Sequence, residues 1–280
     1  MSLRSLLFVP ADRPDRFAKA AASGADALIL DLEDSVAPER KAEGRAAVAD
    51  WLAQNRAIPA FVRVNPLDSG LTDADLAAIL PRNPDGLVLP KAEGAASVRA
   101  LLALAGSAAP PILPIATETP AALFQLGSYA EVSALLAGLT WGAEDLPAAI
   151  GAATAREEGG RYTPPYEMVR SLALFAAHAA GAPAIETVFP RIDAPDDLGA
   201  YVARARRDGF TAMMAIHPAQ VAIINAGFTP SDTEIAHARA VIDAFAANPG
   251  AGALKVDGRM IDRPHLVQAR RIVAQAARSR

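Results

Sequence analysis

Short apolar runs recur along the chain, and each one is followed by a polar turn and then by a segment with helical periodicity. Eight runs of this kind occur, at residues 5–9, 27–30, 60–64, 86–89, 112–116, 184–189 and 211–216 and in the run that leads into 139–146. They are nearly continuous in apolar character, as strands buried on both faces are. Eight such strands alternating with helices predict an α/β fold, a (β/α)8 TIM barrel, with an open doubly wound sheet as the alternative.

The chain continues beyond the eighth run with elements that a barrel does not need. Ser231 and Glu234 have the spacing of a capping box and predict the start of a helix. Residues 254–261 predict a small hairpin that turns at Asp257-Gly258, and Asp262 precedes a last helix. We therefore predict a C-terminal hairpin-plus-helix extension after the TIM barrel.

Length and composition restrict the class of protein. The 280 residues suit one large domain, and we assign residues 1–228 to the TIM barrel and 229–280 to the C-terminal helical extension. The net charge of -4, with both signs interspersed, argues against nucleic-acid binding and against a polybasic membrane anchor. The absence of cysteine excludes disulfides, thiolate catalysis and cysteine-based zinc sites. No apolar run reaches the roughly 18 residues of a membrane span, and we expect a cytoplasmic protein.

Polar side chains gather after the runs, where the carboxyl ends of the strands meet at one face of a barrel. These side chains are Arg13, Asp31, Glu33, Asp34, Arg63, Asn65, Lys91, Glu118, Glu144, Asp145 and His217. Several carboxylates without cysteine or paired histidine favour a hard cation with oxygen ligands, Mg²⁺ or Mn²⁺. Glu118 and Asp145 follow neighbouring runs and are the predicted ligand pair. The alternative for each of them, and for Glu144, is a charge in the first turn of a helix.

Other charged residues leave a functional and a structural interpretation open. Arg63 lies inside an apolar run, where it binds a substrate carboxylate or forms an internal ion pair with the acidic cluster at residues 31–34. That cluster supplies a base or metal ligands, or it caps the next helix. Lys41 and Arg45 on this helix meet phosphates or form a solvated face. His217 is expected to be a structural, hydrogen-bonding histidine rather than a ligand.

The motifs of the chain, taken together, are similar to those of a known family. They are RSLLFVPADRPDRF, LILDLEDSVAPERKAEGR, VRVN, GLVLPKAE, ATETPAAL, LTWGAEDL, ETVFPRIDAPDDL, AIHPAQV and GRMIDRPHL. In this order, over essentially the whole chain, they resemble the citrate lyase β-subunit-like (CitE-like) branch of the HpcH/HpaI aldolase/citrate lyase superfamily. The resemblance implies a TIM-barrel, Mg²⁺-dependent carbon–carbon lyase, usually a homotrimer, which acts on CoA thioesters of 3-hydroxy acids.

The resemblance also implies roles for residues of the predicted barrel. Glu118 and Asp145 match the two carboxylates that hold the metal ion in the family. Arg63 matches the arginine that binds the carboxylate of the oxo acid. Gly142 and Ala143 match the turn whose backbone faces the substrate.

Two aspartates are implied as acid–base groups. Asp34 stands where related pyruvate aldolases have a histidine base, and Asp262 matches an aspartate that a neighbouring subunit donates. The extension that carries Asp262 is therefore expected to pack on a neighbouring subunit. Arg13 and Lys41 are expected near the phosphates of CoA. Thr117 departs from the bulky apolar residue that many relatives have before the glutamate, and we expect it to affect packing or substrate choice more than the metal.

The expected reaction is a reversible retro-Claisen cleavage. A citryl-, malyl- or citramalyl-CoA type of substrate would give an oxo acid and an acyl-CoA, with Mg²⁺ as cofactor and CoA as part of the substrate. Three alternatives remain open. They are a malyl-CoA-type thioester hydrolase, a β subunit of a multi-protein citrate lyase that acts on an acyl-carrier thioester, and an aldolase for free oxo acids.

Overall fold

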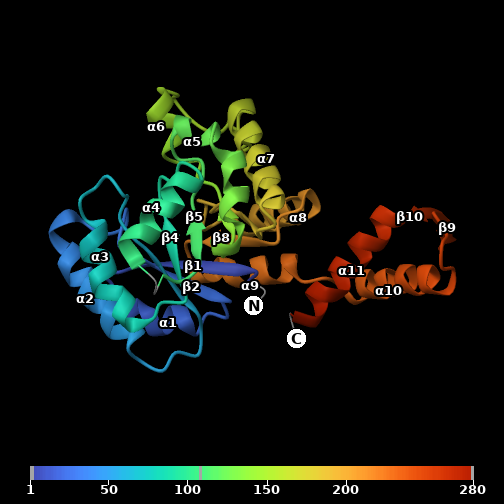
Figure 1. Cartoon of the computed structure of the whole chain (residues 1–280), viewed down its shortest axis with the longest axis horizontal. Coiled ribbons are helices and arrows are strands. Elements are labelled where there is room, and N and C mark those ends of the chain that lie inside the picture. Colours follow the sequence, from blue (N-terminus) through green and yellow to red (C-terminus); the bar gives the residue numbers. More distant parts are fainter. Residues whose placement is uncertain (1–2, 107–108, 279–280) are drawn as a thin grey trace. The chain divides into compact units, whose positions relative to one another are not determined.

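The computed structural model describes residues 3–106 and 109–278 of the chain. These residues form two compact units, the first from Leu3 to Ile224 and the second from Asn225 onward (Figure 1). The boundary lies inside helix α9 (Pro218–Phe228). None of the helices in the described residues is both long and apolar enough to cross a bilayer.

The first unit is built on eight parallel strands in the order β5-β4-β3-β2-β1-β8-β7-β6. The strands are β1 (Ser5–Pro10), β2 (Ala27–Asp31), β3 (Ala60–Arg63), β4 (Gly86–Leu89), β5 (Ile112–Pro114), β6 (Leu139–Thr140), β7 (Ala184–Glu186) and β8 (Ala212–Ala215). The two ends of this order meet through isolated parallel bridges, Ile112 to Leu136 and Ile115 to Thr140. The sheet is therefore a nearly closed barrel, which confirms the predicted TIM barrel over the open doubly wound sheet.

Helices follow the strands and cover the outside of the barrel (Figure 1). The α-helices are α1 (Phe17–Ala21), α2 (Lys41–Leu52), α3 (Thr72–Ile79), α4 (Ala95–Ala105), α5 (Pro120–Leu123), α6 (Leu146–Ile150), α7 (Pro164–Ala179), α8 (Pro195–Asp208) and α9. The 3-10 segments are η1 (Pro14–Arg16), η2 (Pro38–Arg40), η3 (Leu80–Arg82) and η5 (Leu126–Leu135). Proline stands in the first turn of α5, α6, α7 and α8, where its missing N–H leaves no hydrogen bond unmade.

The strands are buried on both faces, as their continuous apolar runs indicate. β2, β3 and β4 are buried at every position, and side chains such as Leu6, Ile29, Phe61, Val88 and Leu113 fill the barrel interior. Since the core occupies the interior, the space for a ligand lies at the ends of the strands.

The sixth strand is much shorter than its apolar run suggested. Residues 134 and 135 end the 3-10 segment η5, and only Leu139–Thr140 pair as strand β6. Leu135 is 37% exposed, unlike a residue in a strand that is covered on both faces. An apolar run of this length fits a helix end as well as a strand, so periodicity alone does not separate the two.

The second unit has the predicted extension. Helix α10 (Asp232–Ala247) begins with a capping box between Ser231 and Glu234. Strands β9 (Ala253–Val256) and β10 (Arg259–Asp262) pair antiparallel, and helix α11 (Arg263–Arg278) follows. The turn places Asp257 at φ 48° and Gly258 at φ 80°, the left-handed conformations that a two-residue hairpin turn requires.

Candidate active site

A pocket of about 370 Å³ opens at the carboxyl ends of the barrel strands. Pro10, Asp31 and Arg63 are the last residues of β1, β2 and β3, and all three line it. Residues that directly follow β5, β6, β7 and β8 line it as well; they are Ile115, Trp141, Thr187 and Ile216. The predicted convergence of strand ends on one place is therefore present in the structure.

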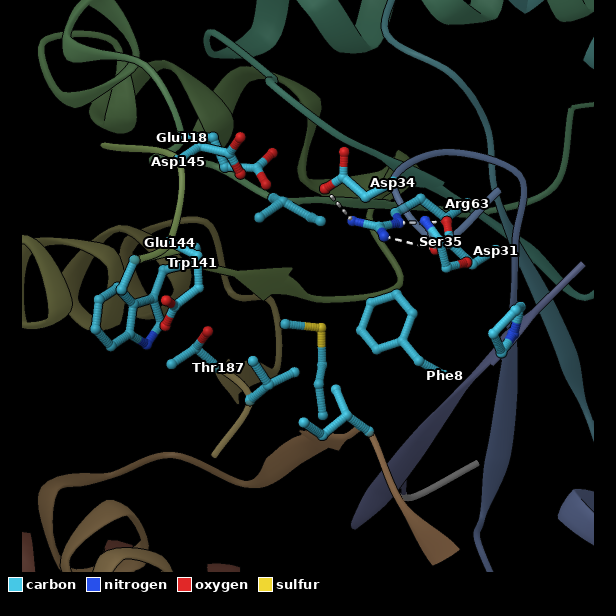
Figure 2. A pocket seen from close by; sticks show the side chains of 17 residues that line it. Phe8, Asp31, Asp34, Ser35, Arg63, Glu118, Trp141, Glu144, Asp145 and Thr187 are labelled. Atoms are coloured by element: carbon cyan, nitrogen blue, oxygen red, sulfur yellow. Dashed lines mark hydrogen bonds and ion pairs between the residues drawn. The ribbon is translucent and has the colours of Figure 1, made fainter. Parts of the chain in front are cut away.

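The two predicted metal ligands lie together on one side of this pocket (Figure 2). Glu118 is 5% exposed, and its Oε2 accepts a hydrogen bond of 2.6 Å from the backbone N–H of Lys91. Asp145 Oδ1 lies 3.7 Å from the ammonium Nζ of the same lysine. Burial, followed by the negative charges of Asp145 and Glu33, raises the pKa of Glu118 to about 8.

This donor set fits a divalent cation that prefers oxygen ligands. Mg²⁺ is commonly held by one or two protein carboxylates and completes its octahedron with water or substrate oxygens. In the described residues, no group of three or more histidine, cysteine and acidic side chains is placed to enclose a metal ion. Glu118 and Asp145 face the pocket as a pair of neighbouring carboxylates, and a cation between them would relieve their repulsion.

Arg63 forms an internal ion pair, which is one of the two roles that the sequence left open for it. Its Nε and Nη2 donate to the two oxygens of Asp31 at 2.6 and 2.7 Å, and its Nη1 lies 2.9 Å from Glu33 Oε2. Burial raises the pKa of Asp31, but the hydrogen bonds and charge of Arg63 outweigh burial and hold that pKa below its usual value. The guanidinium also lines the pocket, so a role in substrate binding stays a proposal.

Asp34, Gly142 and Ala143 line the pocket, as their predicted roles require. Asp34 is the most exposed carboxylate around Arg63, and its Oδ2 lies 3.6 Å from Arg63 Nη1. Gly142 packs tightly, because a Cβ built on it would lie 2.8 Å from Cγ of Glu118. The chain can approach Glu118 this closely only where the side chain is missing.

The family of the chain follows from comparison with known proteins. A model of the HpcH/HpaI aldolase/citrate lyase family matches residues 4–218. The chain belongs to this family. A citrate lyase subunit beta-like protein of Mycobacterium tuberculosis is 36% identical over 277 residues, which cover 96% of this chain and 94% of the relative. As a member of the HpcH/HpaI family, the protein is a carbon–carbon lyase.

Two further similarities extend over the whole chain. A (3S)-malyl-CoA thioesterase of Cereibacter sphaeroides is 35% identical over 282 residues, which cover 98% of this chain and 94% of the relative. The crystal structure of protein CitE from Mycobacterium tuberculosis, in complex with magnesium, acetoacetate and coenzyme A, aligns with a TM-score of 0.83 at 34% identity. That alignment covers 99% of this chain and 98% of the other. The resemblance to the CitE-like branch of the HpcH/HpaI family is therefore confirmed.

The structure gives no geometric support for the predicted phosphate contacts of this family member. The ammonium of Lys41 donates to Leu32 O, Glu33 O and Asn65 Oδ1 at 2.7 to 2.8 Å, which occupies its three N–H groups. Arg13 is paired with Asp15 through two hydrogen bonds of 2.9 and 3.0 Å. Neither cation lines the pocket, because a nearer acceptor holds each one.

Two predicted polar residues have local hydrogen-bond partners. Asp262 ends β10 in the second unit, where its Oδ1 lies 2.5 Å from Nδ1 of His265. The described lining of the pocket comes from the barrel unit, and whether Asp262 of a neighbouring subunit reaches it stays a proposal. His217 Nδ1 accepts a hydrogen bond from the N–H of Ala219, as expected for a structural histidine.

Two residues that organise the site of this HpcH/HpaI protein had no role assigned from the sequence: Lys91 was named only as one of the strand-end side chains, and Glu186 was not singled out. Lys91 joins both sides of it, with Nζ 2.7 Å from Glu33 Oε1 and its backbone N–H on Glu118. Glu186, fully buried at the end of β7, accepts a hydrogen bond of 2.6 Å from the indole N–H of Trp141 in the pocket wall. A charge inside an apolar run signals a buried partner, and that signal was available for Glu186 as it was for Arg63.

Proposed function

We propose that this protein is a Mg²⁺-dependent lyase that cleaves a CoA thioester of a 3-hydroxy acid into an oxo acid and an acyl-CoA. Citryl-, malyl- and citramalyl-CoA are the types of substrate that fit this reaction. The carrying observation is the pair of carboxylates, Glu118 and Asp145, that faces a pocket also lined by Arg63. The complex of the Mycobacterium tuberculosis relative with magnesium, acetoacetate and coenzyme A supports the same cofactor and the same kind of substrate here.

Each residue of the pocket has a proposed part in this reaction. When bound, Mg²⁺ would supply Lewis-acid polarisation of the hydroxyl and carboxylate oxygens. Glu118 and Asp145 hold the cation, and Arg63 fixes the carboxylate of the future oxo acid, which orients the bond to be broken. Gly142 and Ala143 line the pocket, where their backbone would face the substrate.

The proton and electron movements balance with one base and one acid. Asp34, or Asp262 of a neighbouring subunit, removes the proton of the 3-hydroxyl group as that oxygen becomes a carbonyl. The bond between C2 and C3 breaks, and its electron pair passes to the thioester as an enolate. Protonation of C2 then gives the acyl-CoA.

Neutral variants of the two carboxylates test this assignment. Glu118→Gln and Asp145→Asn should each lower kcat by at least about 1,000-fold, because each removes one of two protein ligands and its charge. Glu131→Gln, which changes an exposed glutamate, is the matched control and should keep full activity. Cleavage is measured as oxo acid released from citryl-, malyl- and citramalyl-CoA with Mg²⁺. Retained turnover in either site variant would remove the metal assignment.

A thioester hydrolase is the second candidate, favoured by the 35% identity to a (3S)-malyl-CoA thioesterase. The same pocket would then deliver water to the thioester carbonyl of the intact substrate, and the carbon–carbon bond would not be cleaved. Product analysis separates the two, since the lyase gives oxo acid plus acyl-CoA and the hydrolase gives hydroxy acid plus free CoA. Turnover of free CoA substrates by the isolated protein would also argue against a subunit that needs an acyl-carrier thioester.

A further inference from the structure

The side chain of Thr117 joins two neighbouring strand ends of the barrel. It is completely buried directly before Glu118. Its hydroxyl donates a hydrogen bond of 2.9 Å to Gly142 O and accepts one of 3.1 Å from Gly142 N–H. One hydroxyl therefore satisfies both backbone groups of a residue that follows the next strand.

These two hydrogen bonds lie where the barrel wall is least continuous. Neighbouring strands elsewhere in the barrel form ladders of consecutive pairs, whereas the β5 and β6 segments of the chain are joined by two separate bridges, Ile112 to Leu136 and Ile115 to Thr140. The last main-chain hydrogen bond across this join runs from Ala116 N to Thr140 O, at 2.9 Å. Thr117 extends the join beyond that point with its side chain, toward the pocket.

The connection reaches both proposed metal ligands. Thr117 is bonded through the chain to Glu118, and Gly142 precedes Asp145 by three residues. Gly142 also lies against the Glu118 side chain, since a Cβ on it would be 2.8 Å from Cγ and 3.2 Å from Oε1. A displacement of Gly142 would therefore change both the position of Glu118 and the separation of the two carboxylates.

We infer that Thr117 is a positioning residue that fixes the spacing of Glu118 and Asp145 and so sets the affinity of the protein for a divalent cation. The inference rests on the metal site of the proposed function. A neighbour that orients a metal ligand typically accounts for roughly 10- to 100-fold in metal affinity. The expectation that Thr117 affects packing or substrate choice more than the metal is replaced by this inference.

Three variants at matched positions test the role of the hydroxyl. Thr117→Val keeps the shape and removes both hydrogen bonds, and Thr117→Ser keeps the hydroxyl. Thr140→Val makes the same change at a buried residue of β6 whose hydroxyl contacts only the sulfur of Met214, at 3.8 Å, in the described structure. The dissociation constant for Mg²⁺ is measured calorimetrically on each folded protein without substrate, and the unfolding temperature is measured without metal.

The inference predicts that Thr117→Val weakens Mg²⁺ binding at least about tenfold, while Thr117→Ser and Thr140→Val stay within about twofold of the native value. If Thr117→Val does not fold, Thr117→Ala takes its place, since it removes the hydroxyl without a methyl group beside Gly142. A folded Thr117→Val or Thr117→Ala protein with native Mg²⁺ affinity and only a lower unfolding temperature would make the residue merely structural and overturn the inference. Absence of Mg²⁺ binding by the native protein would instead overturn the proposed function, and the inference with it.

Discussion

Glu118 is a carboxylic acid whose surroundings oppose its charge. Burial is the largest cause, and the negative charges of Asp145 and Glu33 add to it, while the N–H and the ammonium of Lys91 act in the opposite direction. The resulting pKa of about 8 means that the metal-free protein carries a proton on Glu118 at neutral pH. A cation that binds to this carboxylate has to displace that proton.

Metal binding should therefore release protons in a pH-dependent way. Because the pKa of Glu118 is raised to about 8, each Mg²⁺ ion that binds should release close to one proton at pH 6.5 and almost none at pH 9. The affinity for Mg²⁺ should rise with pH between these values. Calorimetry in two buffers of different ionisation enthalpy counts the protons. A proton count near zero at pH 6.5 would show that Glu118 is already ionised or does not bind the metal.

At the scale of single elements, Glu186 ties helix α7 to the strand ends beneath the pocket wall. Its Oε2 accepts a hydrogen bond of 2.7 Å from Nε of Arg170 on α7, and its Oε1 accepts those of Trp141 and of the Thr187 N–H. Arg170 also donates to Asp208, at the end of α8. Both partners of the Arg170–Glu186 pair are at most 2% exposed, so neither can exchange its partner for water.

Removal of one partner should leave a buried charge without compensation. Arg170→Met is expected to lower the free energy of unfolding by about 3–5 kcal/mol. Arg99→Met is the control, because the Arg99–Glu131 pair is more than half exposed and contributes at most about 1 kcal/mol. Urea unfolding followed by circular dichroism gives both values. Equal, small losses would mean that the buried pair is no stronger than a surface pair.

Hydrogen bonds from the side chain of Lys41 stabilise the loop after β2. Its ammonium holds two carbonyls of this loop and the side chain of Asn65. Lys41→Met should lower the unfolding free energy by about 1–3 kcal/mol, whereas the exposed Lys19→Met should leave it unchanged. A contact with CoA phosphates predicts a different result, a higher KM for the thioester at native stability, so denaturation and kinetics on the same variant separate the two roles.

Strand positions were predictable from apolar runs because the barrel buries both faces of each strand. The carboxylates of the pocket were predictable for the same reason, since strand ends meet at one face. The hydrogen-bond partners of individual polar groups could not be predicted from the sequence. Thr117 meets Gly142 through the register of neighbouring strands, and Lys41 meets Asn65 because helix α2 begins near the end of β3. Composition and periodicity encode neither relation.

At the scale of the whole molecule, the proposed site combines a barrel from one chain with Asp262 from another. We expect a homotrimer in which each second unit serves a neighbouring barrel. Co-expression of Glu118→Ala and Asp262→Ala subunits, each inactive alone, should then restore about a quarter of the native sites, because half of the barrels and half of the neighbouring tails remain intact.

Two observations decide this prediction. Glu118→Ala mixed with Asp145→Ala is the control and should restore nothing, since both residues belong to the same barrel unit. Different affinity tags on the two kinds of subunit, used in succession for purification, establish that mixed oligomers have formed. Mixed oligomers without recovered activity would place Asp262 outside the reaction or within its own chain's site.

The join between β5 and β6 lies next to the two proposed metal ligands, so metal binding should affect the stability of the protein. Glu118 and Asp145 follow the two neighbouring strands of this join, which two bridges, main-chain hydrogen bonds and the side chain of Thr117 hold together. A cation bound between the two carboxylates would add a link between these two strand ends, and it would stabilise the native state by mass action. Depletion of Mg²⁺ should then lower the stability of the native state together with the activity.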